Sequence, residues 1–274
     1  MKILVIAATG NVGTQIVGQL HASGHAVRAV TRDPAASAFP AGVEVVRGDL
    51  SEPGSIGACL GGVDAAFLLW PLHSGRHLPA VLDVIASRVG RVVFLGTGGV
   101  PDLGFEEQER LVHGCGVPST VLRPSTFAVN TLWWADQIRA GDVVSGAFGK
   151  LPMTLIDEID MAAVAVRALT EDGHSGATYT LTGPEILTQT EQVEVIGKAL
   201  GRPLRWQELT RSQARARLLA DPGFPDSFVD VLLDGYAQML AGPPPTTTDT
   251  VERLTGRPAH TLHEWATRHA PDFT

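Results

Sequence analysis

A turn that contains two glycines follows the first apolar run of the chain. Ile3–Ala7 is a continuous apolar run typical of a buried parallel strand, and Val12–Ala22 beyond the turn has helix-forming character. At such a position, backbone N–H groups and a helix N-terminus can bind a pyrophosphate, although an ordinary strand–helix turn is the alternative. The sequence predicts a dinucleotide site whose phosphate loop comprises Thr9, Gly10, Asn11, Val12 and Gly13.

The loop departs from the GxxGxxG pattern because Ala7 stands at the first glycine position. A Cβ atom there could narrow the turn around a pyrophosphate. Gly10 would allow close backbone approach to the ligand, and Gly13 would let the helix pack closely on the sheet.

The end of the second predicted strand bears on the choice of dinucleotide. Sites selective for NAD place a carboxylate here, whereas NADP sites place an arginine for the 2′-phosphate. We favour Arg32 as the phosphate ligand and Asp33 as a turn residue before Pro34, although Asp33 lies near the spacing expected for an NAD carboxylate. NADP(H) is therefore the favoured cofactor, with NAD(H) possible. Asp49 and Leu50, after the third strand, could border the adenine or form an ordinary Asp turn.

The first half of the chain alternates short β-branched runs with longer helical segments. Strands that alternate with helices imply right-handed crossovers and a parallel sheet covered on both faces. We expect strands at residues 3–7, 26–31, 43–46, 65–69, 92–95 and 120–122, with helices at 12–22, 56–60, 78–89 and 106–113.

The pattern changes after Pro124. We expect helices over residues 127–140, 160–169, 190–200 and 262–269, a strand over 179–182 and a Gly-rich stretch over 141–150. The whole pattern predicts an α/β fold in which a doubly wound parallel sheet of the Rossmann type occupies residues 1–125. A smaller, mostly helical α+β lobe at residues 126–274 would bind substrate and return segments to the Rossmann sheet.

Side chains of the second half could form an apolar wall against a flat or aromatic substrate, although each of them could instead pack in a core. These residues are Phe127, Trp133, Trp134, Phe148 and Met153. Thr97 directly follows the fifth strand, where it could hydrogen-bond a substrate oxygen or cap a turn. Asp160 is expected to cap a helix and Arg123 to act as a structural anchor.

Composition excludes several classes of protein. The net charge is −8 and no long Lys/Arg run occurs, so we expect no nucleic-acid partner. Cys59 and Cys115 have no metal-type spacing, so we expect no metal and a reducing, cytoplasmic environment. The N-terminal apolar run is too short for a signal peptide, and no stretch of about 18 apolar residues predicts a membrane span.

Over nearly its whole length the chain resembles the NmrA-like family of atypical short-chain dehydrogenases/reductases. The order of the motifs carries this resemblance: Ala8–Gly13, Val27–Pro34, Gly48–Leu50, Val92–Leu95, Glu109, Thr120–Pro124 with Phe127 and Asn130, and Tyr179–Glu185 with Gly201–Pro203. The resemblance implies a Rossmann domain, a small C-terminal lobe, a substrate cleft between them and NADP(H) binding. It also implies that Leu69 and Trp70 pass near the nicotinamide ribose, and that Thr97 stands where catalytic members carry Ser or Thr.

The sequence lacks the Tyr-x-x-x-Lys pair with which catalytic short-chain dehydrogenases transfer a proton. Neither Tyr179 nor Tyr236 has a lysine four residues on, and the expected positions hold Pro101 and Phe105. We therefore expect reduction of a small apolar or aromatic molecule, a quinone or another conjugated carbonyl, rather than alcohol dehydrogenation. The alternatives are a non-enzymatic NAD(P) sensor that binds a partner protein, and an isomerase or cyclase that uses the same cleft.

Overall fold

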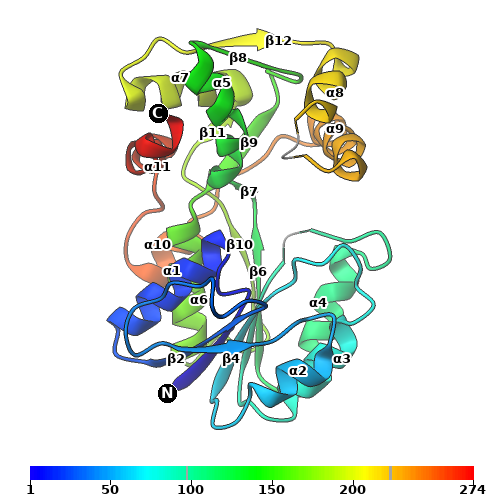
Figure 1. Cartoon of the computed structure of the whole chain (residues 1–274), viewed down its shortest axis with the longest axis vertical. Coiled ribbons are helices and arrows are strands. Elements are labelled where there is room, and N and C mark those ends of the chain that lie inside the picture. The colour runs from blue at the N-terminus through cyan, green and yellow to red at the C-terminus, as the bar shows by residue number, and fades with distance from the viewer. Residues whose placement is uncertain (97, 222–223) are drawn as a thin grey trace. The chain divides into compact units, whose positions relative to one another are not determined.

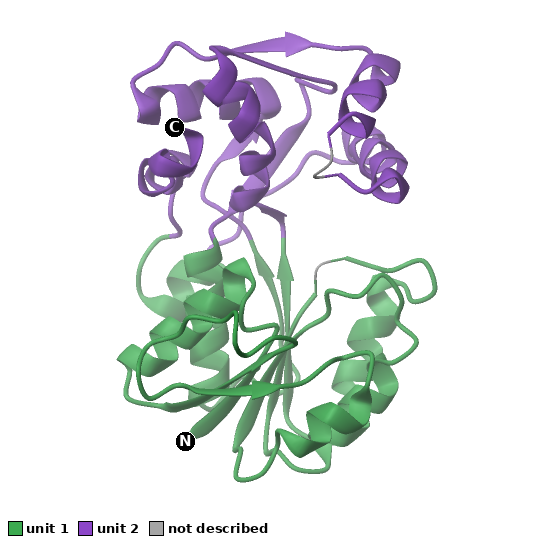
Figure 2. Cartoon of the chain, viewed as in Figure 1, with its two compact units in different colours: residues 1–124, 158–181, 250–258 green, residues 125–157, 182–249, 259–274 purple. Residues whose placement is uncertain are grey.

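The computed structural model describes residues 1–96, 98–221 and 224–274. It divides into two compact units, each assembled from three segments of the chain (Figure 2). Unit 1 consists of Met1–Pro124, Glu158–Leu181 and Thr250–Pro258. Unit 2 consists of Ser125–Asp157, Thr182–Asp249 and Ala259–Thr274.

Unit 1 is built around a seven-stranded sheet in the order β10-β6-β5-β4-β1-β2-β3. All neighbouring strands are parallel. The strands are β1 (Lys2–Ile6), β2 (Ala26–Thr31), β3 (Glu44–Arg47), β4 (Ala65–Leu69), β5 (Val92–Leu95), β6 (Ser119–Pro124) and β10 (Thr178–Leu181). The order reverses direction between β1 and β4, which is where ligands of doubly wound sheets bind. The predicted fold class is confirmed.

Helices cover both faces of this sheet (Figure 1). One face carries α1 (Asn11–Ala22), α6 (Glu158–Thr170) and α10 (Thr250–Thr255). The other carries α2 (Pro53–Ala58), α3 (Leu78–Ala86) and α4 (Phe105–His113). Helix α3 shows why these segments fold as they do, because four of its apolar residues recur at helical spacing and are buried: Leu78, Val81, Leu82 and Ile85.

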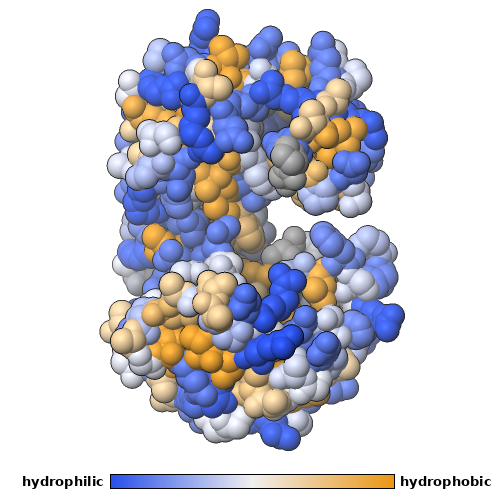
Figure 3. Space-filling view, viewed as in Figure 1, coloured by the Kyte–Doolittle hydropathy of each residue, from blue (hydrophilic) through white to orange (hydrophobic). Residues whose placement is uncertain are grey.

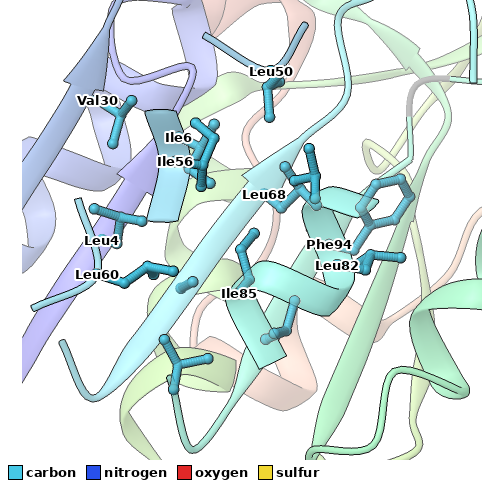
Figure 4. Close-up of a cluster of buried hydrophobic side chains, with 14 of the residues drawn as sticks. Leu4, Ile6, Val30, Leu50, Ile56, Leu60, Leu68, Leu82, Ile85 and Phe94 are labelled. Atoms are coloured by element: carbon cyan, nitrogen blue, oxygen red, sulfur yellow. The ribbon is translucent and has the colours of Figure 1, made fainter. Parts of the chain in front are cut away.

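A hydrophobic core fills the space between the sheet and helices α2, α3 and α4. Figure 4 shows side chains of this core, with Leu4 and Ile6 of β1 beside Leu60 and Ile56, and Phe94 of β5 beside Leu82 of α3. Burial of one such side chain contributes roughly 1.5–3 kcal/mol, so this core holds the strand ends in fixed positions.

Unit 2 contains two small sheets and the remaining helices. The first sheet has the order β11-β9-β7 and the second pairs β12 with β8. The strands are β7 (Thr126–Phe127), β8 (Val143–Gly146), β9 (Pro152–Ile156), β11 (Ile186–Thr188) and β12 (Arg205–Glu208). The helices are η1 (Ala128–Trp134), α5 (Ala135–Ala140), α7 (Gln189–Leu200), α8 (Arg211–Leu219), α9 (Asp226–Ala241), α11 (Leu262–Arg268) and η2 (Ala270–Phe273).

The prediction of a helix over residues 127–140 was correct from Ala128 onward, but the segment begins as a 3₁₀ helix. Phe127 ends a strand, the next seven residues form the 3₁₀ helix η1, and only α5 is α-helical. The hydroxyl of Thr131 donates to the carbonyl of Ala128, three residues back, at 2.8 Å. Such bonding, together with aromatic and β-branched side chains, weakens the α-helical preference of this segment.

The prediction that Asp160 caps a helix was wrong. Helix α6 begins at Glu158, so Asp160 lies inside its first turn. Its side chain is fully buried and forms an ion pair with Arg257 of the same unit at 2.9 Å. The carboxylate therefore has a distant partner that sequence spacing cannot reveal.

Within the described residues, no helix has both the length and the apolar character needed to cross a membrane. Figure 3 shows one face of the molecule, on which hydrophilic and hydrophobic residues are interspersed.

Candidate functional site

A pocket of about 500 Å³ lies in unit 1 at the carboxyl ends of the strands. The turns after β1, β2, β3 and β4 supply its lining, as expected for a ligand site in an open α/β sheet. Of the predicted cofactor residues, the pocket is lined by Thr9, Gly10, Arg32, Asp49 and Leu50.

The phosphate loop and the start of α1 form one side of this pocket. The backbone N–H of Gly10 donates to the carbonyl of Ala7 at 3.1 Å, which closes the turn. Gly10 is the N-cap of α1, no side chain caps the helix, and its first turn holds no acidic residue. Among the described residues of this turn, no side chain therefore neutralises the partial positive charge at the N-terminus of α1. An anion can bind at such a helix end.

Gly13 and Ala7 are held in direct apposition. A Cβ atom on Gly13 would lie 2.2 Å from the carbonyl oxygen of Ala7, so only glycine lets α1 approach the turn this closely. Ala7 itself has a φ of 61°, a left-handed conformation that strains a residue with a side chain. Gly10 has room for a Cβ at ordinary contact distance, so the protein alone does not require glycine there.

Arg32 and Asp33 both line the pocket at the end of β2, but their side chains differ in their hydrogen bonds. The Asp33 carboxylate accepts hydrogen bonds from the backbone N–H groups of Ala35 and Ala36, at 3.1 and 3.4 Å. Asp33 is thus a turn residue, as predicted. Arg32 is exposed at the pocket, and no ion pair joins its guanidinium to the described residues. It is the pocket group best suited to an added phosphate.

Asp49 forms a turn and lines the pocket at the same time. Its carboxylate accepts hydrogen bonds from the Ser51 hydroxyl at 2.7 Å and the Ser51 backbone N–H at 2.8 Å. These bonds hold the pKa of the Asp49 carboxyl below its usual range. Leu50 beside it is largely buried and belongs to the hydrophobic core.

The remaining predicted cofactor residues lie around this pocket rather than in its described lining. Asn11, Val12 and Gly13 belong to α1, Leu69 ends β4, and Trp70 is part of the core, where its indole N–H donates to the Ser74 carbonyl. Pro71 and Leu72 line the pocket at the end of β4 instead. Thr97 lies outside the described residues.

Unit 2 contains a second pocket, of about 330 Å³. Of the five predicted pocket residues, Trp133 and Trp134 line it. Its described lining does not include Phe127, Phe148 or Met153; Met153 is buried, and Phe127 and Phe148 are half-buried. The aromatic residues that sequence analysis missed here are Trp206, Phe224 and Tyr236.

One carboxylate fixes much of the wall around Trp206. Glu208 accepts the indole N–H of Trp206 at 2.7 Å, the backbone N–H of Phe148 at 2.8 Å and that of Gly149 at 2.9 Å. Phe148 has a φ of 66°, so the carboxylate stabilises a strained turn. A Cβ on Gly146 would lie 2.5 Å from the Trp206 ring, so this glycine makes room for it.

Aromatic contacts link residues around the pocket. Trp134 packs edge-to-face with Trp206, with ring centroids 5.8 Å apart, and Phe148 packs likewise on Tyr236 at 6.3 Å. Burial raises the pKa of the Tyr236 phenol to about 12, so the side chain stays protonated at neutral pH. Aromatic and aliphatic side chains therefore make up much of the described pocket wall.

Arg123 anchors the end of β6 within unit 1. Its Nε–H and one of its Nη–H groups donate to the two carboxylate oxygens of Glu109, which is buried on α4. This pairing raises the pKa of Arg123 and agrees with the predicted structural role.

The sheet order and the nucleotide-sized pocket at its carboxyl edge define a Rossmann-type protein. Residues 1–85 match the NmrA-like family. The (4-alkanoyl-5-oxo-2,5-dihydrofuran-3-yl)methyl phosphate reductase of Streptomyces griseus is 37% identical over 282 residues, which cover 99% of each chain. The NAD(P)H azoreductase of Xenophilus azovorans is 34% identical over 287 residues, again covering 99% of each.

The fold of the whole chain has a solved counterpart. The crystal structure of an NADPH-dependent quinone oxidoreductase from Escherichia coli, complexed with NADPH, matches with a TM-score of 0.81 and 25% identity over 97% of this chain and 99% of that one. The chain belongs to the NmrA-like family, and the predicted resemblance is confirmed.

Proposed function

We propose that this protein reduces a quinone or another conjugated acceptor with NADPH, that unit 1 binds the cofactor, and that the aromatic pocket of unit 2 binds the acceptor. The relatives are reductases and oxidoreductases, and two of them are named for their use of NAD(P)H or NADPH, which confirms the predicted class of activity and cofactor. They favour an enzyme over the sensor considered from the sequence.

The unit 1 pocket fits NADPH, and the uncapped N-terminus of α1 beside it is the observation that carries this assignment. The loop from Thr9 to Gly13 would bind the pyrophosphate through backbone N–H groups. Arg32, which has no ion-pair partner in the described chain, would bind the 2′-phosphate. Asp49 and Leu50 would border the adenine.

Hydride transfer to a conjugated acceptor does not need the missing Tyr-x-x-x-Lys pair. Bound NADPH supplies a hydride, and the added charge spreads over the conjugated system of a quinone, so water can supply the proton. The residues of unit 2 would stack on the acceptor and exclude water from its faces. The named acceptors of the relatives, an azo compound, a quinone and an unsaturated lactone, all contain an electron-poor multiple bond.

Steady-state oxidation of NADPH tests this function. The acceptors would be menadione, an azo dye and an unsaturated lactone, each measured with NADPH and with NADH. We expect turnover with at least one acceptor class and a preference for NADPH. Tight binding of NADPH without turnover of any acceptor would contradict the proposal and support a sensor.

A further inference from the structure

We propose that the unit 2 pocket selects acceptors that carry an anionic group beside their flat or apolar part, and that Arg217 binds this group. The inference rests on the proposed function, because it names the chemical class of acceptor for that pocket. It makes Arg217 a specificity-determining residue.

The apolar part of the preferred acceptor follows from the walls. Trp133, Trp134, Trp206 and Tyr236 present aromatic rings, and Leu218 and Leu233 add aliphatic surface. Rings of this kind bind flat or apolar groups through stacking and burial, without regard to charge. Selection by charge must therefore come from the ionised side chains of the lining.

Three ionised side chains line the pocket: Asp136, Arg217 and Asp221. Asp136 forms an ion pair with Arg139 at 2.7 Å, and Asp221 likewise interacts with another group of the protein. No ion pair or side-chain hydrogen bond joins Arg217 to any residue that the structure describes. Within the described lining, Arg217 therefore carries the charge that is available to a ligand.

Arg217 lies on a different side of α8 from Arg211 and Arg215. Arg211 and Arg215 pair with Asp234 and Asp230 of α9, at 2.6 and 2.8 Å. Arg217 lies two residues after Arg215, which is about 200° around a helix. It shares its face of α8 with Ala214 and Leu218, both of which line the pocket.

A guanidinium beside aromatic rings is well matched to an anion. It offers a planar fork of N–H donors to a carboxylate, sulfonate or phosphate. Arg217 would hold the anionic group at the pocket while the rings pack on the rest of the acceptor.

A matched pair of dyes tests the inference. Methyl red carries a carboxylate that its parent dimethylaminoazobenzene lacks. Binding of each dye would be measured by quenching of tryptophan fluorescence, and turnover with NADPH by kcat/KM. In Arg217→Gln, which keeps much of the side-chain length, we expect the preference for methyl red over the parent dye to fall roughly tenfold. Arg217→Glu should invert the preference.

Arg205→Gln is the matched control. Arg205 is an exposed arginine of unit 2 beside Trp206, and it is not part of the described pocket lining. Its replacement removes the same charge and should leave the dye preference unchanged. An unchanged preference in Arg217→Gln, or an equal fall in the control, would overturn the inference. Absence of NADPH turnover with every acceptor would instead overturn the proposed function, because dye binding tests Arg217 without the cofactor.

Discussion

The two pockets are built in different ways. The unit 1 pocket is assembled from turns that each follow a strand directly, and its described lining includes the N-cap residue of α1 and one arginine. The unit 2 pocket is assembled from side chains of η1, β8, β12, α8 and α9, which lie far apart in the sequence. The comparison shows that a backbone site is encoded locally, whereas an aromatic site depends on how distant segments pack.

Each unit also holds one strained turn, at Ala7 in unit 1 and at Phe148 in unit 2. Both are non-glycine residues with positive φ among the described residues. The Ala7 carbonyl lies against Gly13, a neighbour in sequence, while Phe148 depends on the carboxylate of Glu208, about sixty residues away. The Phe148 turn thus has a long-range partner in Glu208, in addition to the local hydrogen bond from the Leu151 N–H to the Phe148 carbonyl.

The largest effect is expected at Gly13. In Gly13→Ala, the new Cβ would collide with the Ala7 carbonyl, so we expect α1 to shift, the free energy of unfolding to fall by about 1–3 kcal/mol and NADPH binding to be lost. Urea denaturation and calorimetric titration measure the two effects. Gly18→Ala in the same helix has open space and should be stabilised by up to about 1 kcal/mol. Equal stability changes in both variants would show that the close approach is unimportant.

The next largest effect is expected at Arg32. Hydrogen bonds to charged groups contribute about 1.5–3 kcal/mol, so Arg32→Ala should weaken NADPH binding roughly tenfold to hundredfold and leave NADH binding nearly unchanged. Calorimetry with both dinucleotides measures this. Arg88→Ala, at another exposed arginine of unit 1, is the control for the loss of charge. If Arg32→Ala weakened the binding of NADPH and NADH equally, Arg32 would have a structural role instead.

A smaller effect is expected at Glu208. Glu208→Gln removes the charge that binds the Trp206 indole and two backbone N–H groups, so we expect about 1 kcal/mol lower stability and a severalfold higher KM for the acceptor. The KM for NADPH should not change. Exposed Glu194 on α7 provides the control substitution, Glu194→Gln. If the KM for NADPH rose as much as the KM for the acceptor, Glu208 would not act through the unit 2 pocket.

The smallest effect is expected at Ala7. Glycine tolerates its positive φ, so Ala7→Gly should raise the free energy of unfolding by roughly 1 kcal/mol or less, because the more flexible unfolded chain offsets part of the gain. Urea denaturation measures it. Ala41→Gly in an exposed turn, where no positive φ exists, should be neutral or destabilising. A loss of stability in Ala7→Gly would mean that the turn carries no strain.

The sequence by itself determined the fold class and the position of the glycine turn that lines the unit 1 pocket. Both depend on local signals: apolar runs of strand length, glycines at fixed offsets from a strand, and helical spacing such as that of α3. The turn role of Asp33 was also predictable, because an aspartate accepts hydrogen bonds from the backbone that follows it.

Only the tertiary structure decided the composition of the aromatic pocket. Trp133 and Trp134 were predicted for it, but Trp206 enters through the pairing of β12 with β8, and Tyr236 and Arg217 enter through α9 and α8. The spacing of Ala214, Arg217 and Leu218 marks a common face of α8 but not what that face meets. Side chains meet across the fold through packing, whereas a turn between a strand and a helix is defined by a few consecutive residues.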